Sequence, residues 1–302
     1  MSGVLAFPGA GEIYSTVCAL LWAISVIYFK KSGEQLGPIP LNFFKDTVAL
    51  LLFVITLPLL GVAFFPADQD LWDWIALLLS GVIGIGIADT VFFASLNRLG
   101  AGRSAVVNCL YSPFIILCSF LYLDERMGPA LWLAMALMIT GILLGTWKPE
   151  PLEDARTSRR LHQGVALGAI SMFLMAVGIV TAKPVLNHSD PIWASMVRLL
   201  GGVAFLALLA LRKTHRAEVR RCFRPGPLWK VTMPAAVIGG YLAMILWISG
   251  MKYTDTTIAG VLNQLSTIFV LILATVWLKE PLTLRRVIAI ILGFGGAVLV
   301  TF

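Results

Sequence analysis

Charged residues are scarce in this chain. Only 13% of its 302 residues are Asp, Glu, Lys or Arg, whereas 59% are hydrophobic and the mean hydropathy is +0.89. A soluble domain has about a quarter of its residues charged, because its surface must face water. The deficit excludes an ordinary water-soluble domain and indicates that much of the protein surface faces lipid.

Residue types that carry enzyme chemistry are also few. The chain has three histidines and four cysteines, and no two cysteines have C-x-x-C spacing, which excludes the usual zinc and disulfide patterns. Walker loops, H-E-x-x-H and Ser-His-Asp arrangements are absent from the sequence. We therefore predict no metal, no cofactor and no enzyme activity. A membrane enzyme acting on lipid head groups would need clustered histidines and carboxylates at one interface, and this sequence has none.

The net charge of +7 does not indicate a nucleic-acid partner, because the basic residues lie between long apolar runs. A membrane-spanning helix needs about 20 mostly apolar residues, and ten such runs are present. Their length and lack of alternation favour helices over a membrane barrel. The predicted fold is an all-α integral membrane protein of about ten transmembrane helices, at 11–30, 40–61, 72–97, 103–123, 129–147, 164–186, 191–211, 228–251, 256–278 and 284–302.

The chain repeats itself at an offset of 153 to 155 positions. We predict a first five-helix repeat over 1–150, a polar connector over 151–163 and a second five-helix repeat over 164–302. An odd number of helices per repeat inverts the second half relative to the first, the plan of many secondary transporters. The matched pairs include Lys30 with Lys183, Pro38 with Pro191, Lys45 with Arg198, Gly84 with Gly239, Asn108 with Asn263, and Glu125 with Glu280.

Basic residues alternate between the loops. The loops that follow odd-numbered helices hold most of the lysines and arginines, including the 212–224 segment, whereas the 66–73 connector is acidic. Since cytoplasmic loops are enriched in Lys and Arg, we expect the basic loops in the cytoplasm and both termini outside. The expected location is a bacterial inner (plasma) membrane.

Asp89 is the sharpest candidate for chemistry, since it lies well inside the third apolar run. An intramembrane carboxylate is costly to bury and normally faces a cavity or a charged partner. One interpretation is a protonatable site that couples solute movement to protons. The other is a structural carboxylate that is hydrogen-bonded to Thr90 or another neighbour on its helix.

Polar and aromatic residues suggest a central cavity. Asn108 and Asn263 are repeat-related amides that either bind solute or bond between helices. Aromatic side chains suit an apolar cavity, with packing or lipid contact as the competing interpretation. The remaining cavity candidates are Trp22, Tyr28, Phe92, Tyr111, Tyr241, Trp247 and Gln264.

Charged residues at helix ends have simpler expected roles. We expect Lys45 and Arg198, near the starts of their helices, to extend toward the membrane interface, with binding of an anionic solute as the alternative. Glu125 and Glu280 follow the fourth and ninth runs, and we expect them to cap or brace helix ends.

Three segments resemble the ten-helix, EamA-like branch of the drug/metabolite transporter superfamily. Leu21-Trp22-Ala23-Ile24-Ser25 is similar to its first-helix motif, and Leu123-Asp124-Glu125 and Leu278-Lys279-Glu280 resemble its G-E-x motif, without the glycine. The resemblance implies a cavity lined mainly by helices one, three, four, six, eight and nine.

The resemblance also implies transport of amino acids, related metabolites or toxic organic compounds, commonly by export and in some members by import. The resulting hypothesis is a secondary transporter that moves a small organic solute across the membrane by alternating access, with lipid and the solute as partners and protons as a candidate third. The alternative is an exchanger of phosphorylated or nucleotide-linked solutes, which needs cationic residues facing the cavity. A channel is the remaining transport possibility.

Overall fold

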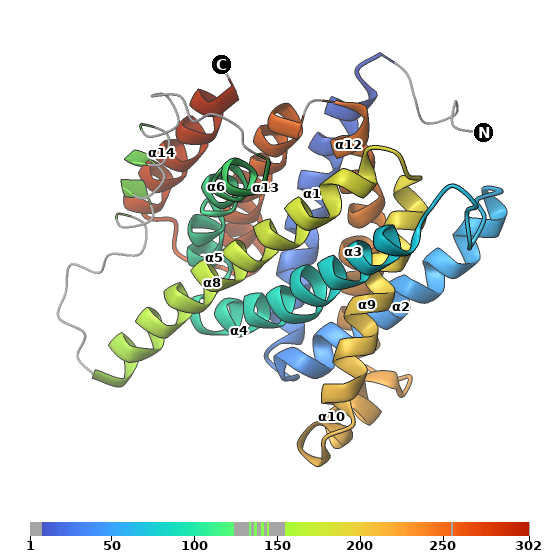
Figure 1. Cartoon of the computed structure of the whole chain (residues 1–302). Helices are drawn as coiled ribbons and strands as arrows, with labels where there is room; N and C mark the ends of the chain where they lie inside the picture. The colour runs from blue at the N-terminus through green and yellow to red at the C-terminus, as the bar shows by residue number, and fades with distance from the viewer. Residues whose placement is uncertain are drawn as a thin grey trace.

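The computed structural model describes residues 8–123, 155–254 and 256–301, with a few isolated positions between 133 and 144. These ranges form a helical bundle (Figure 1). The first half contains α1 (Ala10–Ser32), α2 (Pro38–Leu59), α3 (Leu71–Gly81), η1 (Val82–Ala88), α4 (Asp89–Leu99), α5 (Ala101–Asn108) and α6 (Tyr111–Leu123). The second contains α8 (Ala155–Leu186), α9 (Pro191–Ala210), α10 (Lys213–Phe223), α11 (Trp229–Ala235), η2 (Ala236–Leu242), α12 (Ala243–Tyr253), α13 (Thr256–Trp277) and α14 (Leu284–Thr301).

The predicted all-α membrane fold is confirmed. Among the described residues, seven helices are long and apolar enough to cross a membrane, and shorter apolar helices lie at Leu262–Trp277 and Val287–Gly296. The predicted run at 129–147 lies outside the described ranges. Helix α8 begins at Ala155, inside the predicted connector. Its first turns are polar, so the search for apolar runs did not include them.

The first helices of the two halves, α1 and α8, run in opposite directions. Gly33, just after α1, contacts Asn97 near the end of α4, and Gly164, near the start of α8, contacts Leu99 on the same turns. The end of α1 and the start of α8 therefore lie at one end of the bundle, as Figure 1 shows. This antiparallel arrangement is what an odd number of helices per repeat requires.

Glycines bring the two halves into backbone contact where α3 crosses α9. A Cβ atom at Gly81 would overlap the carbonyl oxygen of Arg198, and one at Gly201 would overlap that of Leu78. Small residues at such crossings let membrane helices approach closely. The crossing holds the middle of α9 against the first half.

Each half contains one π-helical segment at an equivalent position. η1 spans Val82–Ala88 and η2 spans Ala236–Leu242, which is the repeat offset of 154 positions. The wider turn is tolerated because other groups bond the backbone carbonyls: the Asn42 amide donates to Ile85 O at 2.9 Å, and Ser171 Oγ donates to Ala88 O at 2.8 Å. π-helical turns are frequent at functional sites.

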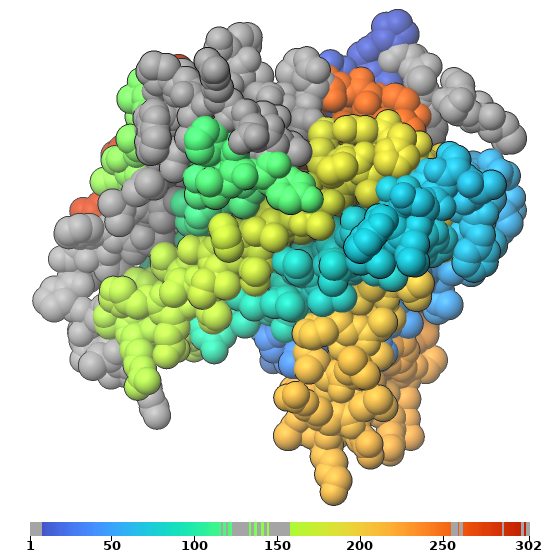
Figure 2. All heavy atoms as spheres, viewed as in Figure 1, coloured from blue at the N-terminus to red at the C-terminus, as the bar shows by residue number. Residues whose placement is uncertain are grey.

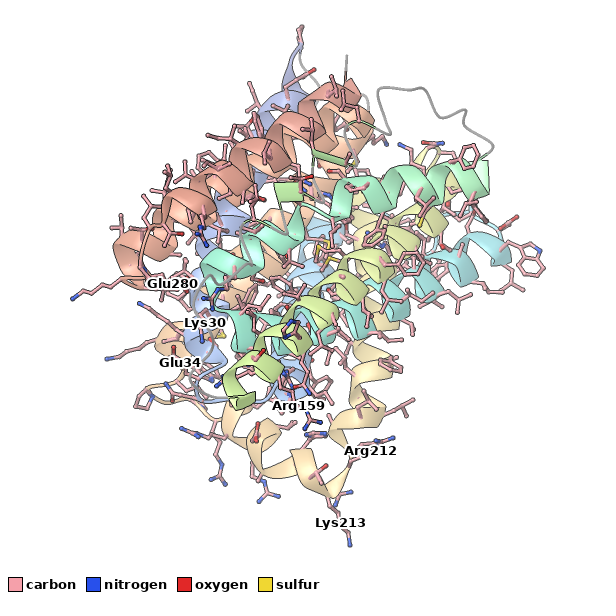
Figure 3. All side chains as sticks on the ribbon, turned by 90° about the vertical axis from the view of Figure 1, so that its left-hand side faces the viewer. Lys30, Glu34, Arg159, Arg212, Lys213 and Glu280 are labelled. Carbon is pink, nitrogen blue, oxygen red and sulfur yellow. The ribbon has the colours of Figure 1, made fainter. Side chains whose placement is uncertain are left out.

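Most of the basic connectors gather at one end of the molecule. Lys30, Glu34 and Arg159 lie toward this end with Arg212 and Lys213 (Figure 3), and the α9–α10 segment projects from it (Figure 2). The start of α1 and the end of α14 lie at the opposite end in Figure 1. We refer to the first as the basic end and to the second as the terminal end.

The expected orientation is testable with single cysteines, because the four native cysteines are buried. Asn187 is exposed at the terminal end and Thr214 is exposed at the basic end. In intact cells, a membrane-impermeant maleimide should label Asn187→Cys, and it should label Thr214→Cys only after permeabilisation, because basic loops face the cytoplasm. Labelling of Thr214→Cys, and not of Asn187→Cys, in intact cells would indicate the opposite orientation.

Candidate functional site

A cavity of about 140 Å³ lies between the two halves. Its volume is close to the roughly 150 Å³ of an engineered apolar cavity that binds benzene, so a ring-sized solute group fits. Both halves contribute to its wall. Of the residues proposed from the sequence, Trp22, Asp89, Phe92, Asn108, Tyr111, Trp247, Asn263 and Gln264 line the cavity.

Tyr28 and Tyr241, also proposed from the sequence, lie outside this cavity. The Tyr28 ring packs edge-on against Trp277, with the ring centroids 6.5 Å apart. The Tyr241 hydroxyl bonds to the Thr56 hydroxyl across the α2–η2 contact, and its ring packs against Phe53. Both tyrosines therefore contact neighbouring helices. The sequence did not indicate this, because hydropathy along the chain does not reveal which face of a helix meets its neighbour.

Lys45 overturns the expectation that it extends to the membrane interface. Its side chain lines the cavity and only 2% of its surface is exposed. Its Nζ forms an ion pair with Asp89 and lies 3.1 Å from Asp46 Oδ1, and it lies over the rings of Phe29 and Phe93. One ammonium is thus shared by two buried carboxylates.

Asp89 is held by its place in α4 immediately after η1. The interpretation that pairs it with Thr90 is not supported, because Thr90 Oγ1 donates to Gly86 O at 2.7 Å and accepts from Asn42 at 3.0 Å. Asp46 differs from Asp89: it is fully buried, and within the described part of the chain neither of its carboxylate oxygens has a hydrogen-bond partner. The cluster of Lys45, Asp46 and Asp89 is hereafter the acid–base cluster.

Arg198 also lines the cavity instead of reaching the interface, and it is 2% exposed. Its Nε donates to Ser80 Oγ at 2.9 Å, and Ser80 in turn donates to Gly178 O at 2.6 Å. The guanidinium carbon lies 5.2 Å from the centroid of the Trp247 ring. No carboxylate pairs with Arg198 among the described residues, and its buried Nη1 has no hydrogen-bond partner there.

Amides form the polar wall of the cavity on the side of α5 and α13. Asn108 lies at the C-terminal end of α5, where the chain turns into α6, and its buried Oδ1 has no hydrogen-bond partner among the described residues. Its repeat mate Asn263 lies near the Cys18 thiol, at 3.8 Å. Gln264 Nε2 donates to Ser112 Oγ at 2.6 Å, so this amide braces two helices.

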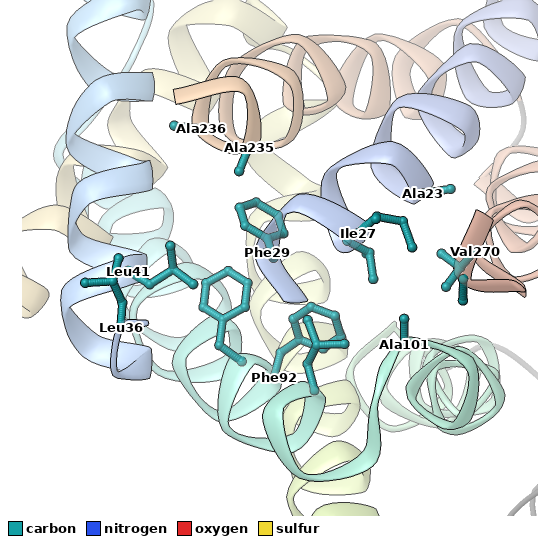
Figure 4. Packing of buried hydrophobic residues seen from close by; sticks show 14 of the residues in the cluster. Ala23, Ile27, Phe29, Leu36, Leu41, Phe92, Ala101, Ala235, Ala236 and Val270 are labelled. Atoms are coloured by element: carbon teal, nitrogen blue, oxygen red, sulfur yellow. The ribbon is translucent and has the colours of Figure 1, made fainter. Parts of the chain in front are cut away.

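Aromatic rings separate the cavity from the basic end. Phe29, Phe92 and Phe93 are each 0–1% exposed, and Trp22 packs against the first two of them at 6.1–6.2 Å between centroids. They belong to a continuous buried cluster that reaches Leu36 and the Cys222 region (Figure 4). The molecule is closed on this side.

Glu280 caps a helix, as the sequence predicts. Its two carboxylate oxygens accept hydrogen bonds from the backbone N–H groups of Ala101 and Gly102, at 2.8 and 3.0 Å. The first turn of α5 has unpaired N–H groups that favour an anion. A residue of the second half thereby holds a helix of the first at the basic end. Its repeat mate Glu125 lies outside the described ranges.

The cavity wall that the family resemblance implied did not include α2 and α9, the second and seventh predicted spans. In the structure these two helices supply Lys45 and Arg198 to the wall. The available signal was their equal spacing, since each lies seven positions after a repeat-related proline, Pro38 or Pro191. That spacing places each cation about two turns inside the helix. The length of an apolar run does not tell whether such a side chain returns to the interface or turns inward.

Comparison with known proteins agrees with this architecture. The model of the EamA-like transporter family matches the chain twice, over residues 9–147 and 162–302. Protein PecM of Dickeya dadantii is 26% identical over 239 residues, covering 76% of this chain and 74% of its own length. An uncharacterized transporter of Archaeoglobus fulgidus is 22% identical over 280 residues, covering 92% and 93%. A solved crystal structure superposes with a TM-score of 0.68 at 18% identity, over 97% of this chain and 96% of that one.

The fold and its central cavity define a membrane transporter built from two related halves. The chain belongs to the EamA-like transporter family. The double match confirms the predicted family and its two-repeat organisation, and it makes the protein a transporter rather than an enzyme.

The acid–base cluster makes a prediction about stability. In Lys45→Gln, two buried carboxylates lose the ammonium that pairs with both of them, and breaking a buried pair in this way costs about 3–5 kcal/mol. The detergent-purified variant should unfold at a clearly lower temperature than wild type, whereas Lys230→Gln, at an exposed lysine, should not. Adding Asp89→Asn to Lys45→Gln should recover part of the loss. Equal unfolding temperatures for Lys45→Gln and Lys230→Gln would contradict the assignment.

Proposed function

We propose that this transporter is a secondary carrier that moves a small organic solute through the central cavity by alternating access. The observation that carries the proposal is one buried cavity with walls from both inverted halves, containing charged and amide groups among aromatic rings. Transporters with inverted repeats bind their substrates near the midplane, where the repeats meet. The solute class is an amino acid, a related metabolite or a drug-like compound.

The proposed cycle rocks the halves about the cavity. Closure at the basic end is supported by the ring cluster of Phe29, Phe92 and Phe93 and by the Glu280 bonds to α5. In the alternate state these contacts separate, and the terminal end closes. The π-helical segments η1 and η2 are suited to bend, since each interrupts a membrane helix beside the cavity.

Protons are the proposed driving ion, bound at the acid–base cluster. Two carboxylates share one ammonium there, so the cluster carries one net negative charge when both acids are ionised. One proton makes it neutral. Asp89 is the coupling residue because it lines the cavity, whereas Asp46 does not. Protonation of Asp89 removes one of the two ion pairs of Lys45, which links proton binding to the cavity's shape and charge.

The alternative is exchange of phosphorylated or nucleotide-linked solutes. It is favoured by one observation: Lys45 and Arg198 both face the cavity. It is weakened by another, because Lys45 is already neutralised by two acids, leaving a single unpaired cation for a doubly charged phosphate. Organic solutes without phosphate are therefore the first proposal.

The proposed location is the plasma membrane of a prokaryote, specifically a bacterial inner membrane. The support comes from the organisms of the similar proteins, one a bacterium and one an archaeon. The expected orientation of the basic end toward the cytoplasm supports the same placement.

Flux measurements in proteoliposomes test the coupling. A panel of amino acids, aromatic acids and cationic drugs should include a solute that accumulates when a pH gradient is imposed. Asp89→Asn should abolish this gradient-driven accumulation and leave downhill exchange, because the variant binds solute without binding the proton. Asp68→Asn, at an exposed loop position, should behave as wild type.

Two results would overturn parts of the proposal. Saturable flux that is indifferent to both pH and Asp89 identifies a facilitator and removes the proton. Flux that neither saturates nor shows counterflow identifies a channel and removes alternating access.

A further inference from the structure

The two cations of the cavity occupy equivalent positions in the inverted halves. Lys45 and Arg198 each lie seven residues after the proline that begins α2 or α9, and each is 2% exposed. Lys45 has the carboxylates of Asp46 and Asp89 as partners. At the offsets of 153 and 155 positions that relate the repeats, the equivalents of these acids are the apolar Leu199 and Met244. The repeat has thus kept both cations but only one set of counter-charges.

Arg198 is therefore a fixed positive charge with no carboxylate at ion-pair distance among the described residues. A guanidinium does not lose its proton in proteins, and a charged group without an ion-pair partner inside a membrane protein is costly. Ser80 Oγ accepts a hydrogen bond from Nε, and the Trp247 ring lies beside the guanidinium. Nη1 is buried without a partner in the described part of the chain. Guanidinium groups pair best with planar carboxylates, through two parallel N–H···O bonds.

We propose that Arg198 binds the carboxylate of the transported solute, and that the solute is a monocarboxylate with an aromatic or similarly sized apolar body. This inference rests on the proposed function, in which the same cavity holds the solute. It adds the chemical class of the solute and the residue that selects it.

The charge of the cavity favours one carboxylate over a phosphate. Lys45 and Arg198 balance Asp46 and Asp89 when all four are ionised, so the empty site is neutral. A bound monocarboxylate makes it singly negative, and one proton on the acid–base cluster restores neutrality. A phosphate dianion would leave two uncompensated negative charges before any proton bound, and Lys45 is not free to neutralise them.

The remaining wall fits the body of such a solute. Trp22, Phe92, Tyr111 and Trp247 give the cavity an aromatic lining. The buried Oδ1 of Asn108, which has no hydrogen-bond partner among the described residues, would accept a bond from a hydroxyl or amino group of the solute. A small aromatic acid with one such donor would match the Arg198 guanidinium, the aromatic lining and the Asn108 acceptor.

Ligand-induced stabilisation of the purified protein tests the inference without requiring transport. The probes are aromatic and branched-chain monocarboxylates, including 3-(4-hydroxyphenyl)propionate, indole-3-acetate and phenylalanine, with their primary amides, phenyl phosphate and the cation tyramine. A ligand that binds the folded protein stabilises it by RT ln(1 + [L]/Kd), so at one concentration the ligand with the lower Kd raises the unfolding temperature more. At least one carboxylate should stabilise wild type well beyond its own amide, phenyl phosphate and tyramine.

Variants of Arg198 locate the effect. Arg198→Met should raise the Kd of the stabilising carboxylate by about tenfold or more, the effect of losing a charge-assisted pair. Arg198→Lys should give an intermediate Kd, because a lysine keeps the charge but lacks the two parallel N–H donors of a guanidinium. Arg212→Gln, at an exposed arginine of the basic end, should bind as wild type. Without ligand, Arg198→Met should be at least as stable as wild type, since the buried guanidinium that it removes makes no ion pair among the described residues to offset its desolvation.

Several outcomes would overturn the inference. These are an Arg198→Met protein that fails to fold or is much less stable than wild type, carboxylates that stabilise no better than their amides, and a preference for phenyl phosphate. The inference and the proposed function can fail separately. Gradient-driven flux of neutral or cationic solutes, without carboxylate binding, would support the carrier and overturn the carboxylate site at Arg198. Carboxylate binding at Arg198 without flux does the reverse.

Discussion

The ion pairing of Lys45 with Asp46 and Asp89 is the interaction on which the centre of this protein depends. Three charged groups lie where the membrane would otherwise demand apolar side chains, and they are tolerated because they lie beside one another. The pairing joins α2 to the first residue of α4, which directly follows η1 in the chain. It also supplies charged groups to a cavity that is lined elsewhere by aromatic rings and amides.

Broken symmetry turns this arrangement into a candidate transport site. The π-helical segments recur at equivalent positions in both halves. The charges do not recur, because the second half retains its cation and lacks both acids. One half thereby offers a site suited to protons and the other a site suited to an anion, with a single cavity between them. In our account, that separation makes coupled transport possible.

Much of this could be predicted from the sequence because a bilayer imposes simple rules. Apolar runs of about 20 residues gave the spans, and the shared offset of Pro38 with Pro191 gave the two halves. Glu280 was correctly predicted to brace a helix end. Asp89 drew attention because a carboxylate in an apolar run is rare, and it does line the cavity.

The errors arose where position along the chain leaves direction open. Lys45 and Arg198 were expected at the interface, because a long cationic side chain two turns from a helix end can extend either way. Tyr28 and Tyr241 face neighbouring helices instead of the cavity. The π-helical segments depend on donors such as Asn42, which is distant in sequence from η1. Such features are decided by packing between helices, which no single run of residues records.

The central claim is that one cavity serves both sides of the membrane in turn. It is tested most directly by the accessibility of a cysteine placed in the cavity wall, with Ser266→Cys in a background without the native cysteines as the reporter. A membrane-impermeant thiol reagent would be applied to right-side-out and to inside-out vesicles. The account predicts modification from both sides, slowed by a transported solute. Modification from one side only, whatever solute is present, would contradict it.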